Sequence, residues 1–537
     1  MNTVPYYTNF REMLDGLKNS YGDQNAITCY SRRGEVKVYS YHDLYYDVLR
    51  FCNALTRENL FGKHIAIAGE NSYAWLVTYL GVTVSGGVAV CIDIEQPDET
   101  VLEMIRMADC EAAFASSDLL PVIHPMVEKK EIKKLFSLDR AQSFAMGFEM
   151  FCGDIKDDLP TDNTLKGEQS AVIIYTSGTT AAPKPVVLSH QAILTNVSDA
   201  LSMFSPTLKM FASLPFYHAY GMTCSVLTGL IGGFGICING NLKTMMRDLI
   251  AYQPGVIAVV PLLAESIHKT IWTESEKSGQ KKALISLLKR YRFLGRPEFL
   301  HRKLQDLART KQFGNLKILI CGGAYLSKEV ADDLTDFGIS VIQGYGITEC
   351  SPLVTVNRFP DNNSVGETLP HTEIKFEDGE ILVRGKSLMS GYYNQPELTA
   401  EVMADGWFRT GDLGEFNREG KLVITGRKKN LIVFKNGKKV SSEEIEGYFA
   451  GISQVKEVVA YGATTGNSTD DVKVAVMIYP DPDKTKGMTS YEILNLLQQE
   501  VDALNVKLPV YKQIQMINLR EQEFEKTSSQ KIKRQIV

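Results

Sequence analysis

Along the first 370 residues, short apolar runs rich in β-branched side chains alternate with stretches of helical periodicity. The runs are predicted to be buried strands at 64–68, 171–175, 256–260, 317–320 and 339–343. Between two of them, residues 191–204 place apolar side chains three or four positions apart, which predicts a helix with Ser189 as its N-cap. Strands that alternate with helices predict an α/β fold with a largely parallel sheet.

The pattern changes after about residue 370. Short strands separated by turn signals predict a small β subdomain at 373–376, 380–384 and 421–425. The last hundred residues predict an α+β unit with a hairpin at Asn436-Gly437, a helix capped by Ser441, strands at 455–461 and 473–479, and a helix at 491–505. We therefore predict a large multi-sheet α/β N-terminal domain (1–428) that includes the β subdomain, and a small mobile α+β C-terminal domain (429–537).

One long stretch, from Met210 to Leu242, contains no Asp, Glu, Lys or Arg. Its length would suffice for a membrane span. Several glycines and Pro215 interrupt it, which favours a buried helix and strand around a pocket. No apolar run follows a basic start at the N-terminus, so we expect no signal peptide.

Composition narrows the class of protein. Hydrophobic residues make up 44% of the chain and charged residues 23%, the balance of a soluble globular protein. A net charge of -5 gives no reason to expect nucleic acid as a partner. The nine cysteines are scattered without a C-x-x-C pair, which predicts reduced, mostly buried thiols in a cytoplasmic protein.

The most informative motif is Y-T-S-G-T-T-A-A-P-K at 175–184, directly after a predicted strand. Triphosphate oxygens need many donors close together, and hydroxyls, amides freed by a glycine turn and a lysine supply them. A polar surface turn is the alternative. The candidate phosphate-binding residues are Thr176, Ser177, Gly178, Thr179, Thr180 and Lys184.

Four later motifs follow in order: Q-G-Y-G-I-T-E-C-S-P at 343–352, G-W-F-R-T-G-D-L-G at 406–414, G-R-K-K at 426–429 and K-T-S-S-Q-K-I at 526–532. Together with the loop they resemble the signature motifs of the adenylate-forming superfamily, which includes acyl-CoA synthetases, non-ribosomal adenylation domains and luciferases. The resemblance covers nearly the whole chain. It implies a ligase that uses ATP and Mg²⁺ to convert a carboxylic acid to its acyl-AMP and then passes the acyl group to the thiol of CoA.

The resemblance also implies roles for residues near the nucleotide. Tyr345 would stack on adenine, Thr348 would bind the α-phosphate, and Glu349 would hold a Mg²⁺ that offsets phosphate charge. A helix-start capping pair is the alternative for Thr348 and Glu349. Backbone would approach the adenylate closely at glycine-rich turns, namely Gly322, Gly323 and Ala324 after one strand and Gly344 and Gly346 in the later motif.

Further roles fall on the C-terminal part of the chain. Asp412, expected in a turn, would accept both ribose hydroxyls, and Arg427 would add a donor. Lys531 would stabilise charge on the carboxylate and phosphate during adenylation, although its basic tail otherwise suggests a frayed, solvated end. Lys429 would be the hinge about which the small domain rotates between the two half-reactions.

The substrate is inferred from the uncharged stretch. An amino acid's ammonium group would find no acid between 210 and 242, so an uncharged acyl group is favoured. His218 would gate the acyl site, with Tyr220 and Gly323 beside the substrate; a core histidine is the alternative. Residues 277–303 carry nine Lys or Arg and one acid, an insertion similar to that of bacterial long-chain acyl-CoA synthetases. A fatty acid is therefore the leading substrate, with aryl acids next.

That same basic stretch predicts either peripheral contact with an anionic inner membrane face or simply a solvated helical surface. The chain departs from the superfamily pattern at Ala181, Pro185 and Gln530, where glycines usually stand. A stiffer loop would weaken ATP binding. Two alternative functions therefore remain: a ligase that loads a carrier protein's pantetheine arm, and a catalytically impaired nucleotide- or acyl-binding homologue.

Overall fold

The computed structural model describes residues 4–30, 34–153, 165–176, 183–308, 313–434, 438–449, 452–464, 472–526 and 532–534. Contacts divide the chain into a first unit, Met1–Glu373 with Arg384–Phe408, and a second unit, Ile374–Val383 with Arg409–Val537. The second unit thus contains strands of the predicted β subdomain. The predicted domain boundary between 428 and 429 stays a prediction.

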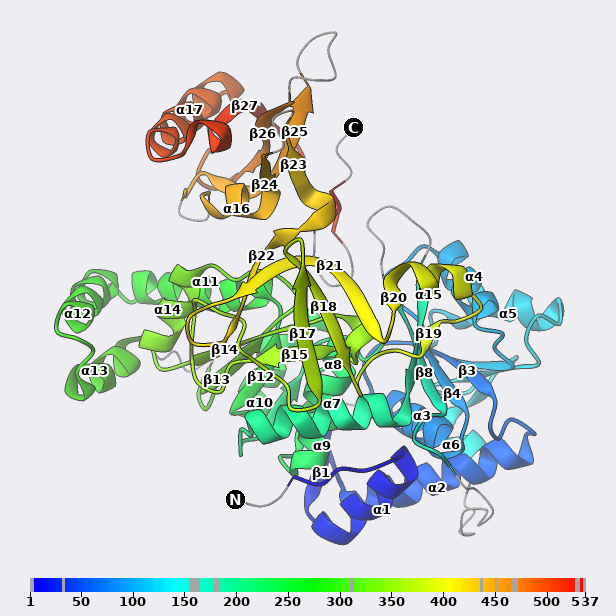
Figure 1. The fold of residues 1–537 in the computed structure, drawn as a ribbon. Coiled ribbons are helices and arrows are strands. Elements are labelled where there is room, and N and C mark those ends of the chain that lie inside the picture. The colour runs from blue at the N-terminus through cyan, green and yellow to red at the C-terminus, as the bar shows by residue number, and fades with distance from the viewer. Residues whose placement is uncertain are drawn as a thin grey trace. The chain divides into compact units, whose positions relative to one another are not determined.

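One sheet of the first unit has the strand order β19-β9-β8-β4-β3-β5-β6-β7 (Figure 1). Its strands from β8 to β7 pair in parallel, and β9 pairs antiparallel with both neighbours. The strands are β3 His64–Ala68, β4 Val88–Cys91, β5 Ala112–Ala115, β6 Lys134–Ser137, β7 Met146–Gly147, β8 Ser170–Thr176, β9 Lys184–Ser189 and β19 Gly391–Tyr392. The helices that connect them are α2 Tyr41–Arg57, α3 Tyr73–Val84, α4 Asp98–Met107, α5 Leu120–Glu128 and α6 Phe148–Cys152.

A second sheet of this unit has the order β16-β15-β14-β13-β12-β10-β11-β1-β2, parallel from β14 to β1. Its strands are β1 Asn25–Tyr30, β2 Val36–Ser40, β10 Met210–Ala212, β11 Ile236–Ile238, β12 Val256–Val259, β13 Ile318–Cys321, β14 Ser340–Gly346, β15 Leu353–Val356 and β16 Glu367–Thr368. The unit also contains α1 Phe10–Tyr21, α7 His190–Met203, α10 Met245–Tyr252, α11 Pro261–Lys277, α12 Lys281–Phe293, α13 Glu298–Ala308, α14 Lys328–Asp336, α15 Pro396–Val402 and β20 Met403–Ala404.

The predicted strands and the helix near 191–204 are confirmed, and the Ser189 hydroxyl accepts the Ala192 amide as the helix cap. The uncharged stretch folds into β10, α8 (Ala219–Gly221), a π-helix (Met222–Leu227), α9 (Thr228–Gly232) and β11, all largely buried. Across the described ranges, no helix combines the length and apolar character that a bilayer crossing requires. All nine cysteines are buried, and none of them forms a disulfide.

The second unit begins with a sheet in which β18 lies between β17 and β21, and β22 pairs with β21. A hairpin of β23 and β24 follows, and a sheet of order β25-β26-β27 packs on a core that includes Ile445, Phe449 and Leu497. Its elements are β17 Thr372–Glu377, β18 Glu380–Gly385, β21 Trp407–Phe416, β22 Leu422–Arg427, β23 Leu431–Val433, β24 Lys439–Ser441, α16 Ser442–Gly447, β25 Val455–Thr464, β26 Val472–Pro480, α17 Ser490–Asn505 and β27 Ile514–Leu519.

These observations confirm the predicted α/β class with a small α+β C-terminal part. Ser441 caps α16 through the Glu444 amide, as its sequence predicts. The flanks of the predicted hairpin pair antiparallel, while the turn residues Asn436 and Gly437 lie outside the described residues.

Candidate active site

The predicted phosphate loop connects two paired strands. Thr176, the last residue of β8, lies opposite Lys184, the first residue of β9. The Tyr175 hydroxyl donates to the carbonyl of Met104, which fixes β8 against α4. The loop is therefore held at both ends by the sheet. Its remaining candidates, Ser177, Gly178, Thr179 and Thr180, and the unusual Ala181 lie outside the described residues, so their role stays a prediction.

Lys184 and Glu349 both lie next to one tyrosine, Tyr392. The Tyr392 hydroxyl donates to Glu349 Oε1 at 3.0 Å, and Lys184 Nζ lies 5.4 Å from the centre of the Tyr392 ring. Burial raises the pKa of Tyr392, and the Glu349 carboxylate raises it further, so the hydroxyl stays a donor. The structure thus brings the lysine of the loop and the predicted Mg²⁺ carboxylate together through a residue that the sequence did not single out.

The segment that carries Thr348 and Glu349 is a 3-10 turn, Thr348–Cys350, between β14 and β15. The buried Asn196 side chain of α7 fixes the chain just beyond it: its amide nitrogen donates to the carbonyls of Leu353 at 2.7 Å and Cys350 at 3.2 Å, and its oxygen accepts the Leu353 amide at 3.1 Å. Three hydrogen bonds from one buried side chain leave this segment little freedom.

Glycines keep the strand ends close together. A Cβ on Gly346 would lie 2.2 Å from the Pro352 carbonyl, and one on Gly344 would lie 3.0 Å from the Thr355 carbonyl. Gly323 has a φ of +88°, a conformation that side chains disfavour. Tyr345, between the first two glycines, is half-buried on β14 and pairs with Thr355. The predicted close backbone approach at these turns therefore has a steric basis.

These glycines line a small apolar cavity of about 80 Å³. Gly322, Gly323, Gly344 and Gly346 meet Tyr220, Cys224, Thr228 and the apolar side chains of Phe204, Leu353 and Val356 there. The Tyr220 hydroxyl donates to the Ile320 carbonyl at 2.7 Å, which ties the uncharged stretch to β13. This volume is below the ~300–1,000 Å³ of typical ligand pockets. The cavity is therefore too small to indicate the length of an acyl chain.

Among the described residues, neither His218 nor Ala324 lines this cavity, although both were predicted to lie in the active site. His218 is half-buried just before α8 and packs edge-on against Tyr217, with ring centres 4.8 Å apart. Ala324 is exposed beyond Gly323. The gating role of His218 therefore stays a prediction.

In the second unit, Asp412 and Arg427 are direct cross-strand neighbours on β21 and β22. Arg427 Nε lies 2.8 Å from Asp412 Oδ1, and Asp412 is only 3% exposed. The expectation of a turn at Asp412 is wrong. Gly411 does take a left-handed φ of +70°, but pairing with β22 keeps Asp412 in the strand.

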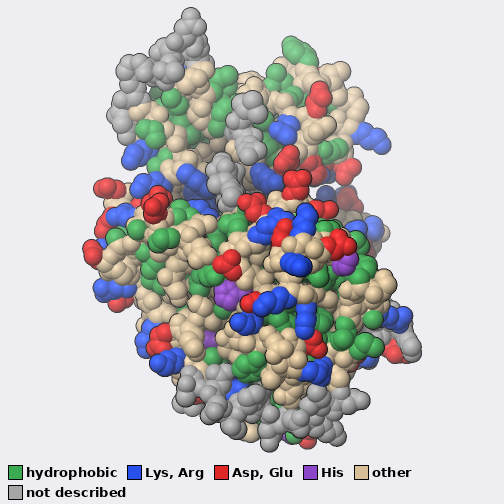
Figure 2. All heavy atoms as spheres, turned by 90° about the vertical axis from the view of Figure 1, so that its right-hand side faces the viewer, with side chains coloured by type: hydrophobic (Ala, Val, Ile, Leu, Met, Phe, Trp, Pro, Cys, Tyr) green, Lys and Arg blue, Asp and Glu red, His purple; other side chains and the backbone are tan. Residues whose placement is uncertain are grey.

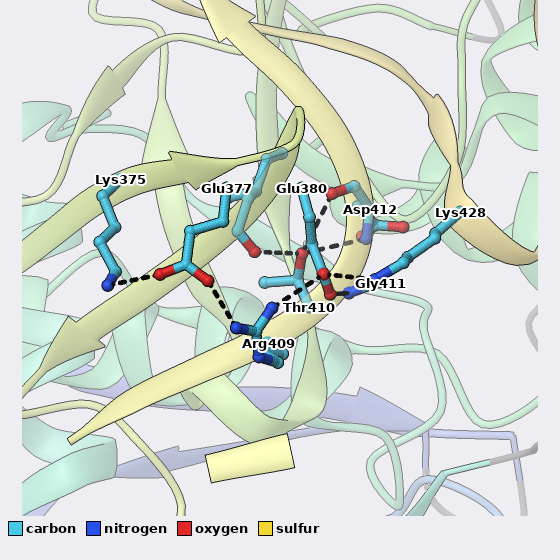
Figure 3. Close-up of polar contacts among 9 residues, drawn as sticks. Lys375, Glu377, Glu380, Arg409, Thr410, Gly411, Asp412 and Lys428 are labelled. Atoms are coloured by element: carbon cyan, nitrogen blue, oxygen red, sulfur yellow. Dashed lines mark hydrogen bonds and ion pairs between the residues drawn. The ribbon is translucent and has the colours of Figure 1, made fainter. Parts of the chain in front are cut away.

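A buried carboxylate lies beside this site (Figure 3). Glu380, at the start of β18, accepts the Gly411 amide at 3.2 Å, and its other oxygen pairs with Arg409 at 3.2 Å and Lys428 at 2.9 Å. The Thr410 hydroxyl accepts the Asp412 amide at 3.0 Å. Glu380 is 4% exposed, so its charge is compensated within the unit. Sequence reasoning missed it because E-D-G-E indicated only a turn.

Lys531 lies outside the described residues, but its flanks are anchored. Lys526 and Ile532 form an antiparallel bridge, and Lys526 Nζ lies 2.5 Å from Glu457. Arg534 binds both oxygens of Glu446, at 2.7 and 2.6 Å. Burial raises the pKa of Glu446 to about 6, and Arg534 opposes that shift. The described flanks are thus ion-paired to β25 and α16, whereas a frayed end would be solvated.

The predicted hinge residue, Lys429, is exposed in the short 3-10 helix Lys428–Asn430. The chain before it packs tightly, because a Cβ on Gly426 would lie 2.4 Å from the Ser441 hydroxyl oxygen. After it, Asn430 donates to Glu443 of α16 at 2.5 Å. Rotation about Lys429 itself stays a prediction.

The first unit is therefore an α/β unit with two sheets and glycine-lined strand ends. Residues 18–393 match the family model described as AMP-binding enzyme, and residues 429–537 match the AMP-binding enzyme C-terminal domain. The first match spans well over half of the chain, so the chain belongs to the AMP-binding enzyme family.

Individual relatives agree with this membership. Long chain acyl-CoA synthetase 1 of Arabidopsis thaliana is 29% identical over 83% of this chain and 74% of its own length. A long-chain-fatty-acid–CoA ligase of Bacillus subtilis (strain 168) is 25% identical over 85% and 83%, respectively. Among solved structures, anthranilate CoA ligase AuaEII in complex with anthranoyl-AMP has a TM-score of 0.78 at 16% identity, covering 98% of this chain and 96% of its own. ATP-bound MatB from Rhodopseudomonas palustris has a TM-score of 0.77 at 22% identity, covering 98% and 97%. At these identities the structures show a shared fold.

Proposed function

We propose that this chain is a fatty acyl-CoA ligase. A fatty acid carboxylate oxygen attacks the α-phosphorus of ATP and pyrophosphate leaves, which forms acyl-AMP. The thiol sulfur of CoA then attacks the acyl carbon, AMP leaves, and the thiol proton passes to solvent. Family membership and relatives named for long-chain fatty acids support this proposal. The observation that carries it is the group formed by Lys184, Tyr392 and Glu349 at the base of the predicted phosphate loop.

The residues present fit a magnesium-bound nucleotide. Across the described residues, no group of three or more His, Cys, Asp or Glu side chains could hold a metal. Mg²⁺ needs no such group, since it usually takes one or two carboxylates plus substrate phosphates. Glu349, oriented by Tyr392, is suited to that role, with Lys184 close by. When bound, the ion would neutralise phosphate charge as pyrophosphate leaves.

Residues of the second unit would act on the same nucleotide. In this proposal Asp412 accepts the ribose hydroxyls, and its pairing with Arg427 at 2.8 Å orients the carboxylate. Lys531 would add positive charge where the carboxylate meets the α-phosphate. The anchors at Lys526 and Arg534 support a defined position for this segment.

The acyl group is expected to be uncharged. The cavity beside Gly322 and Gly323 has apolar walls, and the π-helix that contributes Cys224 lies in the stretch without acids. That stretch offers no carboxylate to pair with an ammonium group. An alkyl chain fits this chemistry, and an aryl acid is the second choice.

Pro185 is one of the residues that motivate the impaired-homologue alternative, but its place in the fold tolerates a proline. It lies at the start of β9 opposite Tyr175, and its carbonyl accepts the Tyr393 amide at 2.8 Å. On that side β9 borders only the short edge strand β19, where the missing amide costs at most one ladder hydrogen bond. We therefore favour an active enzyme, and we propose the cytoplasm as its location because its cysteines are buried and form no disulfide.

Pyrophosphate release tests the proposal. The purified chain is given ATP, Mg²⁺ and a panel of alkyl and aryl acids, with and without CoA, and the acyl product is identified by mass spectrometry. Fatty-acid-dependent release with acyl-CoA formation is expected. Release without acyl-CoA would point to a carrier protein as acceptor, and no release with any acid would support the binding-only alternative.

A further inference from the structure

Part of the basic run at 277–303 serves to hold the fold together. Arg292 of α12 pairs with Asp333 and Asp336 of α14, and Arg296 pairs with Asp336, all within 3 Å. Lys277 and Lys281 pair with Glu274 and Glu276 at the end of α11. Lys281, Arg292 and Arg296 thus fasten the α12–α13 hairpin to α11 and α14, and Lys277 pairs within α11. The other five are exposed, and in the described part of the chain none has an acid within salt-bridge distance: Lys282, Lys289, Arg290, Arg302 and Lys303.

The turn between α12 and α13 exposes three large apolar side chains. Phe293 ends α12 and is 89% exposed, Leu294 follows at 48%, and Phe299 in the first turn of α13 is 63% exposed. A left-handed Gly295 and Arg296 form the tight turn between them. Contiguous exposed apolar patches mark interaction surfaces, and this single turn carries three large exposed apolar side chains.

Cations flank these apolar residues at helical spacing. Lys289 and Arg290 precede Phe293 by four and three residues, and Arg302 and Lys303 follow Phe299 by three and four. Side chains at these spacings are neighbours on a helix surface. Two acids are close, Glu298 at the start of α13 and Asp306 one turn beyond the second cation pair. We call Phe293, Leu294, Phe299 and the four cations the hairpin tip.

The hairpin is a fixed part of the first unit. Leu284, Leu288, Leu300 and Leu304 are buried in the same core cluster as β12 and β13. The rings of Tyr291 and His301 stack across the two helices with centres 5.6 Å apart. In Figure 1 the α12–α13 pair lies at the edge of the unit, beside α11 and α14. The exposed phenylalanines are therefore presented by a rigid support.

We propose that the hairpin tip docks on an anionic lipid bilayer. Aromatic and leucine side chains enter the boundary between headgroups and acyl chains, while flanking Lys and Arg side chains meet the lipid phosphates. A fluid lipid surface can take up three exposed apolar side chains without a preformed groove. A protein partner would have to provide a groove that matches them. The inference goes beyond the proposed function, because it concerns where the chain binds and not what it converts.

Sedimentation with sucrose-loaded vesicles tests the proposal, without ATP, acid or CoA. Vesicles of phosphatidylcholine alone are compared with vesicles containing phosphatidylglycerol, at low and high salt. We expect binding to the anionic vesicles that weakens with salt. The variant Phe293→Ser/Leu294→Ser/Phe299→Ser should lose at least tenfold in affinity, and Lys289→Gln/Arg290→Gln about fivefold per cation.

Matched controls come from other surfaces. Lys129→Gln/Lys130→Gln removes two exposed cations after α5, on the side of the unit where Figure 2 shows acidic and basic side chains interspersed. Phe359→Ser removes an aromatic side chain that is 78% exposed elsewhere in the unit. Both controls should bind vesicles as the unchanged chain does, and circular dichroism should show that every variant is folded.

Vesicle binding that does not depend on anionic lipid would overturn the proposal, and so would equal losses of binding in the tip and control variants. Tip variants that change only self-association, measured by sedimentation velocity, would also overturn it. The vesicle assay contains no substrate, so vesicle binding can be observed even if the chain has no ligase activity. Likewise, ligase activity can be observed even if the chain does not bind vesicles.

Discussion

The hydrogen bond from Tyr392 to Glu349 gives the sharpest prediction about catalysis. Tyr392→Phe removes one oxygen and keeps the ring beneath Lys184, since the cation lies over the ring face. Tyr392 is 6% exposed, so water does not easily replace its hydroxyl. The change should leave the fold intact and remove the 3.0 Å hydrogen bond that orients the Glu349 carboxylate.

The size of the effect follows from that contact. A hydrogen bond to a charged group contributes about 1.5–3 kcal/mol, and loss of a residue that orients a metal ligand typically costs about 10–100-fold in metal affinity or activity. We therefore expect Mg²⁺-dependent ATP binding to weaken at least tenfold in Tyr392→Phe. Isothermal titration calorimetry of ATP at several Mg²⁺ concentrations measures this directly, and pyrophosphate release gives the effect on rate.

The neighbouring residue supplies the control. The Tyr393 hydroxyl donates to the exposed Asp109 at 3.1 Å, away from Glu349, so Tyr393→Phe should bind ATP normally. In a double-mutant cycle, Tyr392→Phe should add little once Glu349→Ala is present, because the two act through one contact. Equal behaviour of the two phenylalanine variants, or full additivity with Glu349→Ala, would refute the reasoning.

The remaining predictions concern residues that support the site. Asn196→Leu leaves the carbonyls of Cys350 and Leu353 and the Leu353 amide without their partner; we expect urea unfolding to show a loss of about 3 kcal/mol, at ~1 kcal/mol per bond, together with reduced pyrophosphate release. Glu380→Gln should raise the KM for ATP at least fivefold with little change in KM for the acid, because it loosens the Gly411 turn before Asp412; equal changes in both values would contradict a role at the ribose. Burial raises the pKa of Glu446 from 4.5 to about 6, so this group stabilises the fold below about pH 4.5 and loses that contribution as the pH rises through 6. Glu446→Gln should therefore gain about 2 kcal/mol of unfolding free energy relative to the unchanged chain between pH 4.5 and 7, measured by urea unfolding across that range.

Sequence patterns predicted the elements whose signals are local. Apolar runs such as 64–68 and 171–175 coincide with β3 and β8 because a strand buried on both faces needs continuous apolar residues. The caps at Ser189 and Ser441 were predictable because the donor lies three residues away. The uncharged stretch was recognised as buried, although its π-helix was not foreseen.

Contacts between distant parts of the chain escaped prediction. Asn196 meets Leu353 across 157 positions, and Tyr392 meets Glu349 across 43, so no short window of sequence shows either pair. Asp412 was expected in a turn because T-G-D is a turn signal, but cross-strand pairing with Arg427 decides its conformation. Tertiary pairing prevails over local preference at this position.

The central claim is that this chain makes acyl-AMP with the help of Lys531. Exchange of labelled pyrophosphate into ATP isolates that step, since it needs only ATP, Mg²⁺ and the acid. We predict exchange that depends on a fatty acid in the unchanged chain, and a loss of at least a hundredfold in Lys531→Ala with ATP binding retained, since one preorganised charge at the reacting centre supplies about 2.7–4 kcal/mol. Exchange that is absent with every acid, or undiminished in Lys531→Ala, would contradict the account.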